Sequence, residues 1–300
     1  MIVGAAILFF AIYSVTKLIS TEKTIDQAKA GLAFGTLLNP FETGVEEGKS
    51  ASISFTQETR IYAECSASPP FGEQQISIAT RSGVGKAWSE PGVASVFPHK
   101  YLFTSSTIEG TQFTVFSKQF IFPYKVADVL FILPQESNYC LIDAPYDVEN
   151  DLTSLNLAPI QFVQATTECK PQSTKVCFTN TGCDIDVNLG AQTVKKFKQT
   201  LYFASTGRDN TLLYGALFSD PAIYECQLKR LTLRTAELAT LYQQTAAFIA
   251  PRGCTSGLEG SLATFSNLSR SMRTSSDLKQ LEIIADDIRR TNDIRSCKIF

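Results

Sequence analysis

Residues 219–253 read SDPAIYECQLKRLTLRTAELATLYQQTAAFIAPRG, and within this stretch the chain changes from strand-like to helical patterns. Pro221 stands at the first position of the predicted helix, where its missing N–H costs no hydrogen bond. The helix is expected to end at residues 251–253, because Pro and Gly follow each other there. One apolar face of the helix is formed by Leu228, Leu231, Leu238 and Leu241.

Two further helices are expected after Gly253. The first has an apolar stripe of Leu258, Leu262, Phe265 and Met272, and the second has Leu278, Leu281, Ile284 and Ile288. Stripes with this spacing are typical of helices that bury one side. Since the connections are short, neighbouring helices should run antiparallel. The sequence therefore predicts a three-helix C-terminal unit.

The region before this unit, from Ser50 to about Ser205, has strand patterns. Residues 51–56 alternate with period two, and residues 129–133 form a short continuous apolar run. One helix is expected within it, at 147–155. Further strands are predicted at 175–178 and 184–187, as the two arms of a small hairpin, and at 198–204 and 212–218.

The N-terminus is predicted to be a membrane anchor. Residues 2–16 carry no charge, and with Leu18 and Ile19 the apolar stretch reaches about 19 residues, close to the thickness of one bilayer core. Residues 1–20 are therefore expected to contact the lipid bilayer. A cleaved signal peptide is the alternative, but no basic segment precedes the run and no small-x-small site follows it closely.

The expected fold class is thus α+β, with an N-terminal transmembrane helix, a β-rich middle and the three-helix unit. The predicted domains are the anchor at 1–35, a β-rich extracytoplasmic domain at 36–206, and a late strand with the helical unit packed on it at 207–300.

The eight cysteines suggest structural disulfides. Cys177 and Cys183 flank a five-residue loop, and Cys254 and Cys297 follow the first and third helices, which should end on the same side. Cys226 could tie the helices to the β-rich region. The partners of Cys65, Cys140, Cys169 and Cys226 stay open, because eight cysteines allow 105 pairings. No zinc-site spacing is present.

Orientation across the membrane depends on two opposing signals. Lys17, Lys23 and Lys29 follow the apolar run and favour a cytoplasmic body. Disulfides require an oxidising compartment and favour the other side. We give the cysteines more weight and expect the body outside the cytoplasm.

Composition excludes several function classes. The 27 Lys and Arg residues nearly balance the 29 Asp and Glu residues, which argues against a dedicated nucleic-acid binder. His99 is the single histidine, and its neighbours Pro98 and Lys100 suggest an exposed loop rather than a catalytic base. We expect no cofactor, no metal and no catalytic set.

Two acidic groups remain as candidates. Asp143, Asp147, Glu149 and Asp151 could serve a hydrolase with paired carboxylates, but we favour the explanation that they cap a turn and the first turn of a helix. Asp184, Asp186 and Asn188 resemble half of a calcium loop, but Leu189 and Lys195 replace the Gly and Glu that such a loop needs. Asn267 begins a glycosylation sequon with Ser269.

The segments Asn39–Lys49 (NPFETGVEEGK) and Ser219–Gln227 (SDPAIYECQ) resemble segments of uncharacterised archaeal proteins with an N-terminal membrane anchor. The resemblance implies an archaeal origin and no particular activity. The anchor is also similar to that of archaeal type IV pilin-like proteins. It differs from them because no processing site precedes the apolar run and no Glu follows early within it.

The first hypothesis for function is a single-pass, membrane-anchored structural or binding component of the cell envelope, within a surface or secretion assembly and in contact with other envelope proteins. The alternative is an anchored extracytoplasmic hydrolase that uses carboxylates such as Asp143 and Asp147. A third hypothesis is a membrane regulator that faces the cytoplasm, which reduced cysteines would favour.

Overall fold

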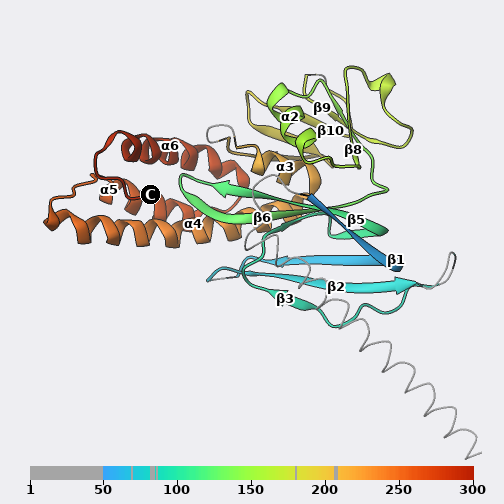
Figure 1. Ribbon diagram of the computed structural model, residues 1–300, viewed down its shortest axis with the longest axis horizontal. Coiled ribbons are helices and arrows are strands. Elements are labelled where there is room, and N and C mark those ends of the chain that lie inside the picture. Colours follow the sequence, from blue (N-terminus) through green and yellow to red (C-terminus); the bar gives the residue numbers. More distant parts are fainter. Residues whose placement is uncertain (1–49, 69, 82–84, 86, 180, 206–208) are drawn as a thin grey trace, which may run out of the picture.

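The computed structural model describes residues 50–68, 70–81, 85, 87–179, 181–205 and 209–300. Two six-stranded sheets occupy the middle of the chain and helices form its C-terminal part (Figure 1), which confirms the α+β class. The predicted anchor at 1–35 lies outside the described residues. Among the helices that the structure describes, none is both long and apolar enough to cross a bilayer.

The first sheet is antiparallel except at one edge, where β4 runs parallel to β6. The order across it is β3-β2-β1-β5-β6-β4. Its strands are β1 (Ser50–Ser66), β2 (Glu73–Arg81), β3 (Ser95–Phe97), β4 (Leu102–Phe103), β5 (Thr107–Ile121) and β6 (Lys125–Pro134).

This first sheet folds over on itself along β1. The pairing of β1 with β5 shifts register between Ser54 and Thr59, and such an irregularity bends a strand. Figure 1 shows β1 crossing from the β5–β6 layer to the β2–β3 layer. Ile61 of β1, Ile78 of β2 and Phe113 of β5 are buried together in the space between the two layers.

The other face of β5 and β6 is buried as well. Phe116 and Phe131 stack there with ring centroids 4.5 Å apart, and they belong to the large core shared with the second sheet and the helices. Because both faces of β6 are covered, residues 129–133 are apolar without alternation, as a doubly buried strand requires.

The second sheet has the order β12-β11-β10-β9-β7-β8. Its β8–β7–β9–β10 part is parallel, and its β10–β11–β12 part is antiparallel. The helix α2 (Tyr146–Ser154) connects β7 to β8 and confirms the helix predicted at 147–155. The strands are β7 (Tyr139–Ile142), β8 (Ile160–Val163), β9 (Thr174–Cys177), β10 (Ile185–Asn188), β11 (Thr193–Lys196) and β12 (Gln199–Tyr202).

The hairpin predicted for 175–178 and 184–187 is wrong, because β9 and β10 run parallel. The chain between them returns to the start of β9 before it enters β10. A carboxylate oxygen of Asp184 accepts a hydrogen bond from the backbone N–H of Lys175 at 2.8 Å and fixes this return. Two short strands close in sequence suggest a hairpin, but this side-chain contact favours the parallel arrangement.

The C-terminal helices are α3 (Thr211–Phe218), α4 (Pro221–Ile249), α5 (Glu259–Ser271) and α6 (Leu278–Ile294), with 3-10 turns at 250–252 and 275–277; another 3-10 turn, at 166–168, lies between β8 and β9. The strand predicted at 212–218 is wrong, since these residues form α3. Every residue of α3 is buried. A helix covered on all sides shows no polar face, and periodicity cannot distinguish it from a buried strand.

The three predicted C-terminal helices are present as α4, α5 and α6. The first half of α4 packs beside the sheets, and its second half extends away from them with α5 and α6 (Figure 1). We call residues 236–249 of α4, together with α5 and α6, the helical arm. Leu262 and Phe265 of α5 and Ile288 of α6 are buried within the core that joins the arm to the sheets.

Candidate functional site

All eight cysteines form disulfides in the structure. The pairs are Cys65–Cys226, Cys140–Cys169, Cys177–Cys183 and Cys254–Cys297. The last two are those predicted from spacing, and Cys226 joins α4 to β1 as expected for a tie to the β-rich region. Disulfides persist in oxidising compartments, so four of them indicate a body outside the cytoplasm.

The four predicted acidic residues near α2 have separate surroundings. Asp151 forms an ion pair with Lys118 at 2.8 Å and accepts a hydrogen bond from the hydroxyl of Tyr214 at 2.8 Å. Burial, followed by the charge of Asp151, raises the pKa of Tyr214. The first turn of α2 contains Asp147, which accepts a hydrogen bond from the side-chain amide of Asn210 at 3.0 Å.

Asp143 and Glu149 lie apart from this network. Asp143 follows β7 with a left-handed backbone, at φ 52°, and accepts a hydrogen bond from the hydroxyl of Thr179 at 2.8 Å. Glu149 is exposed on α2. A cavity of about 470 Å³ beside α2 is lined by Asp147 and Asn210 but by neither Asp143 nor Asp151. The two carboxylates named for the hydrolase therefore do not share this cavity.

Asp184, Asp186 and Asn188 position the backbone of their own loops. Asp184 binds the N–H of Lys175 as described above. Asp186 accepts hydrogen bonds from the N–H groups of Gly182 and Cys183, at 3.2 and 3.0 Å. Asn188 accepts one from Ala191 at 2.9 Å. Within the described ranges, no group of three His, Cys, Asp or Glu residues could hold a metal ion.

Asp186 and Asn188 nevertheless lie on a polar face of the second sheet. Cross-strand register places Asp186, Lys195 and Thr200 in one row, and Asn188, Thr193 and Tyr202 in the next. Residues 178, 179 and 181 of the loop between β9 and β10 border this face, and together they form a depression of about 870 Å³, which we call the sheet groove. Its other lining residues are Phe178, Thr179, Thr181, Val187, Leu189, Gly190 and Ala191.

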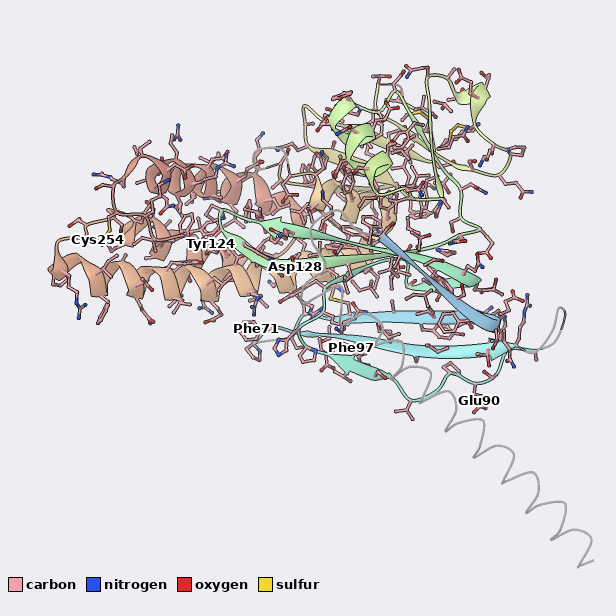
Figure 2. The ribbon with its side chains drawn as sticks, in the orientation of Figure 1. Phe71, Glu90, Phe97, Tyr124, Asp128 and Cys254 are labelled. Atoms are coloured by element: carbon pink, nitrogen blue, oxygen red, sulfur yellow. A yellow bond between two sulfur atoms is a disulfide. The ribbon has the colours of Figure 1, made fainter. Side chains whose placement is uncertain are left out.

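Arg230, a residue that sequence reasoning missed, is fully buried in α4. Its guanidinium donates hydrogen bonds to the carbonyl oxygens of Lys100 at 2.7 Å and Pro98 at 2.9 Å. It also donates to the carbonyl of Phe71 at 3.2 Å. Figure 2 shows Phe71, in a turn, and Phe97, at the end of β3, below α4. His99 is exposed on a loop that Arg230 holds in place. In the sequence, the only indication that Arg230 is buried is its position next to Leu231, which lies on the apolar face of the predicted helix.

Lys196 is a second buried cation that sequence reasoning missed. It lies on β11, and its ammonium group donates hydrogen bonds to the carbonyl oxygens of Leu217, at 3.0 Å, and of Ser219. These carbonyls lie at the C-terminal end of α3, where a positive charge interacts favourably with the helix dipole. Burial lowers the pKa of Lys196 to about 8, although the charge of Asp220 opposes that shift.

The helical arm has exposed apolar side chains. Leu241 and Phe248 lie seven residues apart on α4, and their exposed fractions are 55% and 64%. The guanidinium carbon of Arg252 lies 3.7 Å from the centroid of the Phe248 ring. Figure 2 shows Cys254 near the end of the arm farthest from the sheets. Leu241 was predicted on the buried face of this helix, and its exposure contradicts that prediction, because the arm has no sheet beneath it at this point.

Asn267 is exposed on α5, within the helical arm. Ser269, the third residue of its sequon, is fully buried. The tripeptide is therefore accessible at its asparagine and inaccessible at its hydroxyl in the folded chain.

Comparison with known proteins identifies no relative: no family model, no curated protein and no solved structure matches this chain.

Proposed function

We propose that this chain is a structural or binding component of the cell envelope, attached to the membrane by its N-terminal segment and exposed outside the cytoplasm. The observation that carries the proposal is the pairing of all eight cysteines in four disulfides. A reducing cytoplasm would keep such thiols free.

The helical arm supports the binding part of the proposal. It extends from the sheets (Figure 1), and Leu241 and Phe248 expose apolar surface along one side of α4. Large aromatic side chains contribute strongly to protein interfaces when a partner covers them. The Cys254–Cys297 disulfide restrains the arm, because it ties the segment after α4 to the segment after α6. We propose other envelope proteins as the partners.

The acidic residues support the hydrolase alternative less strongly than the helical arm supports a binding function. Asp147 accepts a hydrogen bond from Asn210. Asp151 forms an ion pair with Lys118 and accepts a hydrogen bond from Tyr214. Asp143 accepts a hydrogen bond from the hydroxyl of Thr179, a residue that follows β9. Each carboxylate has a structural partner of its own, so we favour the binding component.

Photocrosslinking in the native cells tests this function. A photoreactive phenylalanine analogue placed at Phe248 should yield discrete adducts with another envelope protein. The matched control is the same analogue at Tyr146, an aromatic residue 82% exposed on α2 and distant from the arm, which should yield none. Two results together would refute the proposal: position 248 gives no discrete adduct, and this chain purifies from membranes as a lone monomer.

A further inference from the structure

We propose that the sheet groove is a binding site for a neutral oligosaccharide. The proposal rests on the extracytoplasmic location argued above, where glycans are accessible, but it does not depend on the helical arm. The groove, of about 870 Å³, falls within the usual range of ligand sites, about 300–1,000 Å³.

The charge of the lining argues for an uncharged ligand. Asp186 and Lys195 are the charged residues of the lining, and they lie directly opposite each other on β10 and β11. Their charges balance, so the lining carries no net positive charge to attract a sulfated or phosphorylated ligand. A site for anions would instead present several cations or backbone N–H groups.

The polar groups of the groove match the hydroxyl groups of a sugar. Thr181, Thr193, Thr200 and Tyr202 contribute hydroxyls, which both donate and accept hydrogen bonds. The Thr179 hydroxyl donates to Asp143 and can still accept, and the side-chain NH2 of Asn188 can donate while its oxygen binds Ala191. The side chains of Lys195, Thr200 and Tyr202 have no hydrogen-bond partner among the described residues and are available to a ligand. Leu189 and the ring of Tyr202 add apolar surface against which the C–H face of a sugar ring can pack.

The groove is also held in shape before any ligand arrives. Asp186 binds the backbone N–H groups of Gly182 and Cys183 just before β10, and the Cys177–Cys183 disulfide ties this segment to the end of β9. Asn188 fixes the turn between β10 and β11 through Ala191. Rigid positions lower the entropic cost of binding a flexible ligand.

A polypeptide fits the groove less well. Extended peptides commonly bind by adding a strand to a free sheet edge. The groove lies on the face of β10, β11 and β12, and both β10 and β11 already have neighbours on each side. The backbone N–H and C=O groups of these two strands are therefore not available to a new strand.

Calorimetric titration of the full, disulfide-bonded chain tests the proposal. The neutral ligands are maltotriose, cellotriose, mannotriose and N-acetylchitotriose, and a heparin hexasaccharide is the charged comparison. At least one neutral trisaccharide should bind with a Kd of about 1 mM or lower. The double variant Lys195→Ala/Thr200→Ala should weaken that binding by about tenfold or more. The matched control Lys198→Ala/Gln199→Ala removes an equal charge at exposed positions outside the groove and should bind as the wild type does.

Three results would overturn the inference. The first is that none of the four neutral trisaccharides binds at about 10 mM, tenfold above the expected Kd. The second is that only the heparin hexasaccharide binds. The third is that the groove variant and the wild type bind a trisaccharide equally well. None of these affects the disulfides or the crosslinks of Phe248, so failure of the groove proposal is distinguishable from failure of the proposed function.

Discussion

Cys65 of β1 and Cys226 of α4 form a disulfide that joins residues 161 positions apart. The bond connects the folded-over first sheet to the first half of α4, close to where Arg230 holds the loops beneath that helix. Sheet and helix are therefore linked both covalently and by a buried cation.

Removal of this disulfide should destabilise the chain more than removal of the local one. In the chain-entropy model, a loop of this length contributes about 5 kcal/mol, whereas the Cys177–Cys183 loop, with a separation of six, contributes about 2 kcal/mol. Urea unfolding of Cys65→Ala/Cys226→Ala and Cys177→Ala/Cys183→Ala measures both losses. Equal losses would contradict the structural role assigned to Cys65–Cys226.

Substitution of Arg230 should be strongly destabilising. Arg230→Met leaves the carbonyl oxygens of Lys100, which is buried, and of Pro98 without their donor, and we expect a loss of about 3 kcal/mol or more in the free energy of unfolding. The control is Arg290→Met on α6, since Arg290 is largely exposed and should change stability by less than about 0.5 kcal/mol. Similar midpoints for the two variants in urea would argue against the buried contacts.

Two glycine substitutions should have opposite effects. A Cβ at Gly215 of α3 would lie 2.8 Å from the ring of Phe103, and both residues are buried. Gly215→Ala should therefore cost about 1–3 kcal/mol through overpacking. No atom lies within 4 Å of a Cβ at Gly260 of α5, so Gly260→Ala should stabilise the chain by up to about 1 kcal/mol. Thermal unfolding measures both, and a stabilised Gly215→Ala would contradict the packing of α3.

Lys196 should make stability depend on alkaline pH. Its pKa is lowered to about 8 in the folded chain, while an unfolded lysine keeps its proton up to about pH 10.5. Between these values the unfolded chain binds more protons, so the free energy of unfolding should rise with pH, by at most about 1.4 kcal/mol per unit.

The useful window for this measurement is pH 8 to 10. Above it, unfolded tyrosines ionise while burial raises the pKa of Tyr139 to about 12, which lowers stability again. Urea unfolding across the window should show the rise in the wild type and not in Lys196→Met. An identical pH slope for the two proteins would rule out Lys196 as the titrating group.

The sequence predicts those parts of the fold that depend on local patterns. The helices α2, α4, α5 and α6 each have a polar face and an apolar face, and each was predicted. The helix α3 was predicted as a strand because burial on every side removes the polar face that defines the helical period. The parallel pairing of β9 and β10 is accompanied by the hydrogen bond from the N–H of Lys175 to the carboxylate of Asp184, a contact that no periodicity reveals.

The sites show the same division between local and long-range information. Spacing identified Cys177–Cys183 and Cys254–Cys297, whereas Cys65–Cys226 and Cys140–Cys169 form only once distant strands and helices meet. The buried cations Arg230 and Lys196 were missed because composition does not show which charges are desolvated. The sheet groove assembles residues of three strands, so only the pairing register brings Lys195 between Asp186 and Thr200.

The most direct measurement of the central claim is the number of free thiols in the native cell. Free thiols are alkylated in intact cells, and the mass of the purified protein is then compared before and after reduction with a second label. We expect no first label and eight second labels, because all eight cysteines are paired outside the cytoplasm. Mostly free thiols would place the body in the cytoplasm and contradict the envelope function.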